Sequence, residues 1–346
     1  MMPALSYIIP VFNGGKCVSY CLDSIYSLPL HEEEFEVVVI DDCSTDDTLQ
    51  VLRDYASKHS NMFVLHQEVN QRQGAARNRG IDVAKGEYIA FCDADDTIVA
   101  GGVMNALKAV SETKVDICYF DFEYEQSRGV WQRFQMPFET HNTVLSGRDY
   151  LENYYTCYYN APWRCLYRAD FLRETDIRFE ECVRWEDCDW TVKVYAKAKQ
   201  IQFVDGVGYR YAYGAGSVSH HRMSGGAIAD NIYAGLRLME YGDEIREELS
   251  GLSKVVTDEG RYGYVHNMIR LRNLTKYPLK EIKALYDVLG VKRRQQLLRF
   301  DWPLWDALFL KHRIITMIIL FVGRPLTLLG RGGMKIIRKS RRRLEK

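Results

Sequence analysis

The sequence is poor in the features that mark unusual protein classes. Its 346 residues include 8 prolines, and no segment recurs with the period of a solenoid repeat, so collagen-like and low-complexity proteins are excluded. The nine cysteines are an odd number without a CxxC pair, which favours reduced cytoplasmic thiols over a disulfide framework. Met1–Ile9 lacks the basic and long apolar regions of a signal peptide, and we therefore expect a cytoplasmic protein.

Net charge is absent overall, but the charges are unevenly distributed along the chain. The 46 Lys and Arg residues balance the 46 Asp and Glu residues. Residues 291–346 nevertheless hold 15 basic and 3 acidic residues, so the preceding body carries a matching excess of negative charge. With 47% hydrophobic residues the body is expected to fold. This asymmetry indicates that the basic end meets an anionic surface.

The basic end also contains an interrupted apolar segment. Leu304–Leu329 is broken by Lys311-His312-Arg313 and by Arg324-Pro325, so no stretch reaches the ~20 residues that a transmembrane helix needs. The run Lys335–Arg343 suits anionic lipid headgroups. We predict that residues 301–346 form an amphipathic tail that lies peripherally on the inner face of the cell membrane. A helix packed on the body or on a partner subunit is the alternative.

The first hundred residues alternate between strand and helix patterns. Short apolar runs at Leu5–Val11, Phe35–Ile40, Met62–His66 and Tyr88–Cys92 predict four strands. Helical patterns separate them, including Gly74–Ala84 before the fourth strand. This alternation predicts an α/β fold with a mostly parallel sheet that binds ligands at the carboxyl ends of its strands.

After Ala100 the pattern becomes α+β and then helical. Strands are predicted at Val115–Tyr124, Ile201–Val204 and Tyr209–Tyr213, with a helix at Asp187–Ala198. Only helical patterns follow from about residue 224. We therefore expect three parts: a domain of residues 1–222, a helical region of residues 223–300 and the tail of residues 301–346.

Three carboxylates follow the fourth predicted strand directly. Asp93, Asp95 and Asp96 would repel one another unless a cation or hydrogen-bond donors neutralise them. Oxygen ligands favour Mg²⁺ or Mn²⁺, which bind through one or two carboxylates and complete their shell with phosphate oxygens. A solvated acidic turn or a helix N-cap is the alternative reading of the same residues.

Two further polar segments are predicted at the same edge of the sheet. Asp41-Asp42 ends the second strand and suits a nucleotide pocket, while Ser44 with Asp47 resembles a capping box for the next helix. The glycine-bearing loop Asn70–Asn78 opens a helix with two arginines, which suits a diphosphate. An ordinary basic helix start is the alternative for this loop.

In these motifs the chain resembles the family 2 inverting glycosyltransferases, over roughly residues 4–220. The matching segments occur in the family's order: Pro10-Val11-Phe12-Asn13, Asp41-Asp42-Cys43-Ser44-Thr45-Asp46, the loop Asn70–Gly80, Asp93-Ala94-Asp95, and Glu186-Asp187. One extra residue separates Asn70 from Gly74, which is a departure from the family's loop. The resemblance implies a GT-A fold, a nucleoside-diphosphate sugar donor, and Mg²⁺ or Mn²⁺.

The resemblance also implies roles for individual residues on the donor side. Asp42 would contact the base, expected to be N3 of uracil, and Pro10 and Phe12 would shape the base pocket. Arg77 would face the nucleotide. Asp93 would bind ribose or sugar, Asp95 would ligate the metal with Asp93 beside it, and Asp96 would assist.

On the acceptor side, an inverting transfer needs one carboxylate to take the proton of the attacking hydroxyl. The resemblance assigns this role to Asp187, with Glu186 orienting the base or the acceptor, while Asp189 would point elsewhere. Helix capping is the alternative for these carboxylates. Trp185 is expected to stack on the acceptor sugar. The loop with His220 and His221 resembles one that closes over the donor, and solvated histidines are the alternative there.

The resemblance and the tail together imply a bacterial polysaccharide-assembly enzyme with a glycan or lipid-linked saccharide acceptor. A nucleotidyltransferase also uses paired carboxylates and a metal, but the Glu186-Asp187 segment and the Asn70–Gly80 loop disfavour it. A noncatalytic protein that binds nucleic acid or membrane through its basic tail is a further alternative. Nucleic acid is not an expected partner, because the body is acidic and no recognition module is present. A noncatalytic sugar-nucleotide scaffold would leave the carboxylate set unexplained.

Overall fold

Four parallel strands form the N-terminal half of the sheet. In the computed structural model, β1 (Leu5–Val11) lies between β2 (Phe35–Asp41) and β4 (Tyr88–Phe91), and β3 (Met62–His66) pairs with β2. Every residue of β1, β2 and β4 is buried, as expected for parallel strands that are covered on both faces. The four predicted N-terminal strands and their parallel arrangement are confirmed.

The structure describes part of the chain: residues 2–127, 129–134, 143–154, 161–212, 225–247, 249, 251–257 and 259–260. One compact unit comprises residues 1–223 and 230–266, and therefore includes residues beyond position 222. A second unit comprises residues 224–229 and 267–346, and the predicted tail lies outside the described residues. Among the residues described, no helix is both long and apolar enough to cross a membrane.

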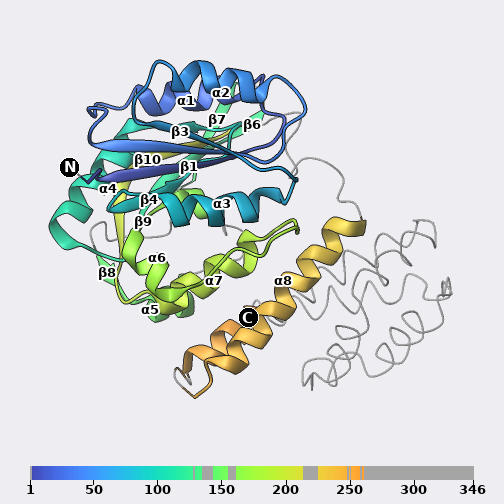
Figure 1. Cartoon of the computed structure of the whole chain (residues 1–346). Coiled ribbons are helices and arrows are strands. Elements are labelled where there is room, and N and C mark those ends of the chain that lie inside the picture. Colours follow the sequence, from blue (N-terminus) through green and yellow to red (C-terminus); the bar gives the residue numbers. More distant parts are fainter. Residues whose placement is uncertain are drawn as a thin grey trace, which may run out of the picture. The chain divides into compact units, whose positions relative to one another are not determined.

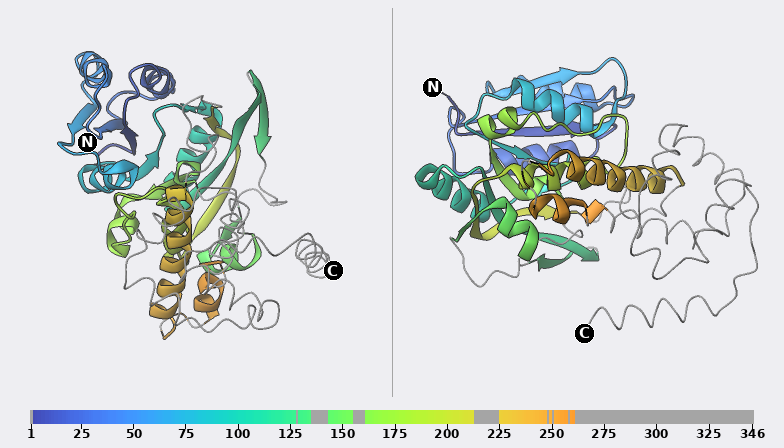
Figure 2. Two further views of the ribbon diagram at one scale, coloured as in Figure 1. Left: turned by 90° about the vertical axis from the view of Figure 1, so that its right-hand side faces the viewer. Right: turned by 90° about the horizontal axis from the view of Figure 1, so that it is seen from below.

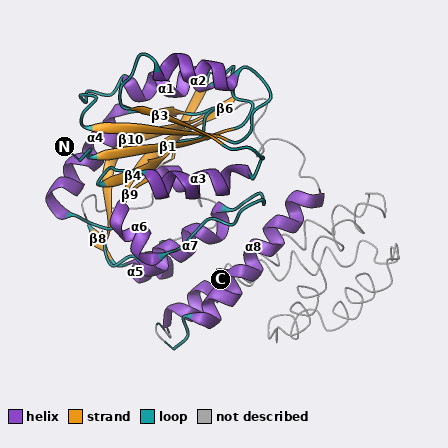
Figure 3. Ribbon diagram, viewed as in Figure 1, coloured by secondary structure: helices purple, strands orange, loops and turns teal. Residues whose placement is uncertain are grey.

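Helices cover both faces of the parallel strands. Helices α1 (Val18–Tyr26) and α2 (Thr48–Ala56) lie on one face and α3 (Arg72–Val83) lies on the other (Figures 1 and 3). Gly80 allows α3 to approach β1 closely, because a Cβ at this position would lie 2.3 Å from Ile8 Cγ2. This contact positions the N-terminal part of α3 beside the carboxyl end of the sheet.

The second half of the sheet mixes strand directions. Strand β9 (Cys165–Arg168) runs antiparallel to β4 and to β6 (Ile117–Ser127), and β6 is parallel to β10 (Ile201–Tyr211). Figure 2 gives two further views of this arrangement. The remaining elements are β5 (Thr97–Ile98), α4 (Ala100–Thr113), β7 (Val130–Phe134), β8 (Val144–Leu145), α5 (Gly147–Asn153), the 3-10 turn η2 (Pro162–Arg164), α6 (Ala169–Thr175), α7 (Asp187–Lys197) and α8 (Gly225–Glu244). The predicted α/β class is confirmed.

The two strands predicted near residues 201–213 are one strand, and that part of the prediction is wrong. Asp205-Gly206 reads as a turn in the sequence, but here it forms an irregularity within β10. Gly206 has a φ of +111°, which glycine adopts readily, and the register with β6 shifts on either side of Val207. Pairing with β6 then resumes, so the strand continues to Tyr211.

An aromatic cluster joins the end of β4 to α7. The Trp190 ring stacks on Phe179 at 4.0 Å between centroids, and both rings lie edge-on to Phe91 of β4. Trp190 is fully buried, and its indole N–H donates to Ile177 O at 3.2 Å. Because α7 starts at Asp187, this cluster fixes the start of α7 relative to the carboxylates that follow β4.

Candidate active site

The three carboxylates after β4 have different surroundings. Asp96 is 1% exposed and accepts hydrogen bonds from Tyr209 Oη at 2.7 Å and from Ala212 N at 2.8 Å. The same Tyr209 oxygen accepts from Asp93 N at 3.1 Å, and Trp163 stacks on the Tyr209 ring. Asp96 therefore supports the turn after β4 through Tyr209, whose hydroxyl group contacts both Asp96 and Asp93.

Their electrostatics favour a cation at this turn. Burial, and then the charge of Asp93, raise the pKa of Asp95. The pKa of Asp96 is raised well above its usual range by burial and by the charges of Asp93 and Asp95. Bound positive charge would relieve this repulsion. No group of three or more His, Cys, Asp or Glu side chains that could hold a metal ion occurs within the described part of the chain.

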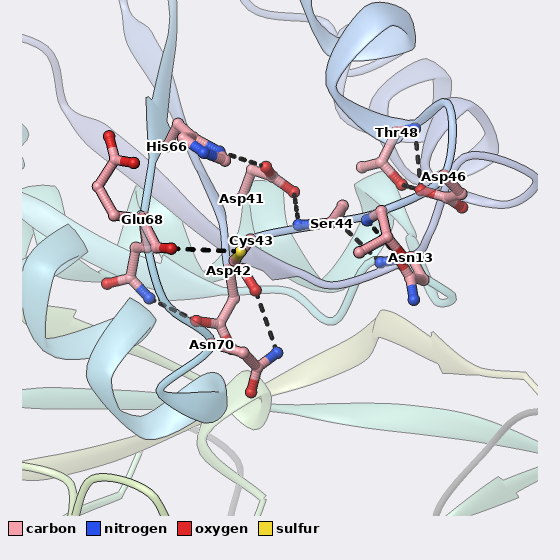
Figure 4. A network of polar contacts seen from close by, with 12 residues as sticks. Asn13, Asp41, Asp42, Cys43, Ser44, Asp46, Thr48, His66, Glu68 and Asn70 are labelled. Carbon is pink, nitrogen blue, oxygen red and sulfur yellow. Dashed lines mark hydrogen bonds and ion pairs between the residues drawn. The ribbon is translucent and has the colours of Figure 1, made fainter.

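The two members of the acidic pair after β2, Asp41 and Asp42, have different hydrogen-bond partners (Figure 4). Asp41 is fully buried, and its Oδ2 lies 2.7 Å from His66 Nδ1. Asp42, 2% exposed, accepts from Gln67 Nε2 at 2.6 Å and from Gln71 N at 2.8 Å through Oδ1. Asn70 Nδ2 donates to the Asp42 carbonyl at 3.1 Å, so this acidic pair and the Asn70 loop lie together as predicted.

Ser44 does not cap the following helix, and the predicted capping box with Asp47 is wrong. Ser44 Oγ instead accepts from Asn13 N at 2.9 Å (Figure 4). Helix α2 starts at Thr48, whose N–H donates to Asp46 Oδ1 at 3.0 Å. The loop after β1 thus uses the serine to hold itself against the loop after β2. Sequence spacing alone could not distinguish these two roles of a short polar side chain.

The two predicted base-pocket residues differ in exposure. Pro10 is buried within β1, opposite Ile40 of β2. Phe12 follows the end of β1 and is 51% exposed. Phe12 therefore presents an accessible ring at the edge of the sheet, whereas Pro10 is covered.

Arg77 of α3 bridges two segments that are far apart in sequence. It is 2% exposed, and its Nη2 lies 2.7 Å from Asp93 Oδ1 while its Nη1 pairs with Glu186 Oε1. Gln73 Nε2 donates to the same Glu186 oxygen at 2.8 Å. Both terminal nitrogens of the guanidinium are thus bound to carboxylates, one to Asp93 after β4 and one to Glu186 before α7.

The second acidic pair, Glu186-Asp187, lies at the start of α7. Glu186 is fully buried, and its Oε2 has no hydrogen-bond partner among the described residues. Asp187 is partly exposed at the first position of the helix. Burial, and then the neighbouring charge of Glu186, raise the pKa of Asp187 to about 8, against an opposing effect of Arg77. A carboxyl group with such a pKa can exchange a proton near neutral pH.

The residues around the pair have distinct environments. Trp185 has a φ of +60°, and its buried indole N–H has no partner within the described residues. Asp189 is buried and pairs with Arg237 rather than lying with Asp187, in agreement with the predicted orientation. His220 and His221 lie outside the described residues.

Sequence reasoning missed Tyr209, Gln67, Gln73 and Arg237. Gln73 lies within the predicted loop Asn70–Gly80 but was given no role, whereas the other three lie outside the predicted motifs. Tyr209 lies in β10, which becomes a neighbour of the turn after β4 only in the folded sheet. No signal in the sequence around these residues distinguishes them from ordinary core or surface positions.

Comparison with known proteins identifies the family. Residues 6–175 match the model described as Glycosyl transferase family 2. Residues 6–175 are thus a domain of that family. The poly(ribitol-phosphate) beta-glucosyltransferase of Bacillus spizizenii is 32% identical over 209 residues, which cover 60% of this chain and 32% of the relative. The chain therefore spans about a third of that curated relative.

Solved structures of the family and of its fold agree with the architecture. The Staphylococcus aureus TarS 1-349 structure in complex with UDP-GlcNAc aligns with a TM-score of 0.66 at 27% identity, covering 83% of this chain and 79% of that one. A mannosyltransferase of Pyrobaculum calidifontis, in complex with GDP-Man and Mn²⁺, aligns with a TM-score of 0.50 at 16% identity, covering 93% and 86%. The predicted GT-A fold is confirmed.

The raised pKa of Asp187 predicts a pH-dependent stability difference. Its folded-state pKa of about 8 exceeds the ordinary value near 3.9, so between these pH values the native protein keeps a proton that the unfolded chain has lost. The wild type should lose stability as pH rises through this window, at up to about 1.4 kcal/mol per pH unit. Asp187→Asn cannot ionise, so its melting temperature should increasingly exceed that of the wild type between pH 5 and pH 9.

Asp170→Asn is the matched control for this measurement. Asp170 also lies in the first turn of a helix, α6, but its side chain is 76% exposed. Its difference from the wild type should stay flat over the same pH range. Parallel thermal denaturation curves for Asp187→Asn and the wild type would contradict the shifted pKa.

Proposed function

We propose that this protein transfers a sugar from a UDP-sugar to a hydroxyl of a glycan acceptor, with inversion at the anomeric carbon. The observation that carries the proposal is the bridge through Arg77, which joins Asp93 of the donor motif to the Glu186-Asp187 pair. A transferase needs these two functions next to each other, because the acceptor attacks the carbon that the diphosphate leaves. Family membership rests on the independent match over residues 6–175.

On the donor side we assign the binding of the nucleobase to Asp42, Pro10 and Phe12. Asp42 Oδ1 already accepts two hydrogen bonds, which fix the carboxylate for contact with N3 of uracil. The exposed ring of Phe12 suits stacking on the base. TarS, at 27% identity, is described in complex with UDP-GlcNAc, which supports a UDP-sugar over other nucleotides. Arg77 contributes to the nucleotide site by holding Asp93, which binds ribose or sugar.

Asp95 and Asp93 would hold a divalent cation, Mg²⁺ or Mn²⁺. Their oxygen ligands fit such an ion, as do the burial and the charge of Asp93 that raise the pKa of Asp95. When bound, the ion supplies Lewis-acid stabilisation of the negative charge on the leaving diphosphate. The protein fixes the turn itself through the hydrogen bonds of Tyr209 and Asp96.

Asp187 acts as the general base. As the acceptor oxygen bonds to the anomeric carbon from the face opposite the nucleotide, Asp187 takes the hydroxyl proton, and the bond to the diphosphate breaks. A pKa near the working pH is the value that makes a carboxylate effective in this role. Glu186, held by Arg77 and Gln73, orients the loop around the base.

For the acceptor we propose a glycan or lipid-linked saccharide of bacterial surface polysaccharide assembly. The Bacillus spizizenii relative is named for activity on poly(ribitol-phosphate), which supports a surface polymer. The unpartnered indole N–H of Trp185, adjacent to the acidic pair, suits a sugar hydroxyl. We further propose that the protein works in the cytoplasm, peripherally on the inner face of the membrane, through the tail of residues 301–346.

Asp95→Ala should abolish metal-dependent binding of the donor nucleotide. The change removes one anionic ligand from a site with few protein ligands, and the diphosphate charge is then poorly compensated. Titration calorimetry with UDP and Mn²⁺ measures the effect, with GDP as the competing nucleotide. Asp54→Ala, an exposed carboxylate on α2, is the control and should keep wild-type affinity. Unchanged UDP affinity in Asp95→Ala would overturn the metal assignment.

Truncation after residue 290 should yield a more soluble protein that still binds UDP but no longer sediments with anionic liposomes. The compact unit of residues 1–223 and 230–266 is retained, whereas the basic and apolar segments are lost. Full-length binding should fall only partly with salt, because charges are screened over about 8 Å at physiological ionic strength while an apolar face stays buried. If the truncated protein unfolds or loses UDP binding, the tail is a packed structural element instead.

A further inference from the structure

The loop that carries the acidic pair is held in an unfavourable backbone conformation. Cys182 and Trp185 both have a φ of +60°, a left-handed conformation that residues other than glycine rarely adopt. Such conformations persist only where the surrounding structure imposes them. One restraint is the hydrogen bond from Cys182 N to Gln71 O at 3.0 Å. Helix α3 adds the contacts of Gln73 and Arg77 with Glu186, and further restraints come from a part of the chain that lies beyond the family match of residues 6–175.

Helix α8 contacts this loop on both sides of the acidic pair. Before the pair, Arg184 N donates to Asp230 Oδ2 at 3.1 Å, and Tyr233 Oη donates to Glu180 Oε1 at 3.4 Å. After the pair, Cys188 Sγ donates to Asn231 Oδ1 at 3.8 Å. In the views of Figures 1 and 2 this helix runs alongside the segment that leads into α7.

The strongest of these contacts is a buried ion pair between α8 and the first turn of α7. Arg237 and Asp189 are 6% and 2% exposed, and the guanidinium binds the carboxylate through Nε, at 2.8 Å from Oδ2, and through Nη2. Lys193 Nζ lies 2.9 Å from the same carboxylate, and the Tyr233 ring lies under the guanidinium. A bidentate pair of this kind fixes orientation as well as distance.

We propose that α8 is a brace for the catalytic loop and that Arg237 is a positioning residue for Asp187. Asp189 lies two residues after Asp187 in the same helical turn, so the ion pair with α8 sets the direction of that turn. The aromatic cluster around Trp190 holds the inner side of α7, and Arg237 holds its outer side. This inference rests on the proposed role of Asp187 as the base.

Arg237→Met tests the brace in the full-length protein. It keeps an unbranched apolar side chain but removes the guanidinium and its charge, and we expect kcat for sugar transfer to fall by about 10- to 100-fold. The KM for the donor and the affinity for UDP should stay within about twofold of the wild type, because the donor residues are not touched. Arg237→Lys should recover part of kcat. Arg246→Met, which removes an exposed ion pair with Asp243, is the control and should leave both kinetic constants unchanged.

The double variant Asp189→Leu with Arg237→Met separates positioning from stability. A buried ion pair can be replaced by apolar residues without loss of stability, whereas Arg237→Met leaves the buried Asp189 with Lys193, which is 19% exposed, as its remaining cation. The double variant should therefore regain the melting temperature that Arg237→Met loses while its kcat stays low. The brace would be overturned if the double variant recovered both melting temperature and kcat. It would also be overturned if Arg237→Met lost UDP affinity and kcat equally.

Asp187→Asn, assayed in parallel, keeps the two proposals distinguishable. Transfer by Asp187→Asn at the wild-type rate removes the base assignment, whatever Arg237 does. Loss of transfer in Asp187→Asn, together with wild-type kcat in the double variant, keeps the base and removes only the brace.

Discussion

The buried guanidinium of Arg77 is the interaction on which the site depends. It places one positive charge between Asp93, which follows β4, and Glu186, which precedes α7. The buried charges of Arg77 and Glu186 would each be costly alone, by several kcal/mol, and their contact, with the partly exposed Asp93 on the other side of the guanidinium, offsets that cost. Glycines make the meeting possible: Gly80 brings α3 onto β1, and a Cβ at Gly74 would lie 2.3 Å from Glu180 O.

The same burial that organises the site makes its base costly to ionise. Asp187 lies close enough to Glu186 and Asp93 for their charges to add to the effect of burial, and Arg77 offsets only part of it. The burial that gives this carboxyl group a pKa suited to proton transfer thus also lowers the stability of the protein at alkaline pH. The strained backbone at Trp185 belongs to the same trade, since the surrounding structure must hold the loop in place.

The sequence predicts the half of the architecture that local patterns encode. Apolar runs located β1, β2 and β4 because parallel strands covered on both faces are buried, and they also located β3, which lies at the edge of the sheet with only Met62 buried; ordered motifs identified the family. Long-range partners could not be predicted: Arg77 and Glu186 are 109 residues apart, and only packing brings them together. Ser44 and the continuous β10 were misjudged for a related reason, because tertiary contacts override the local turn and capping preferences of short polar residues and glycine.

The most direct test of the account is to separate donor binding from transfer in Asp187→Asn. The account predicts that UDP affinity with Mn²⁺ stays at the wild-type value while transfer to a saccharide acceptor falls by about 10² to 10⁴, because only proton removal is lost. Calorimetry and a product assay on the same preparation give both quantities. Transfer near the wild-type rate, or a clear loss of UDP affinity, would contradict the assignment of Asp187 as the general base.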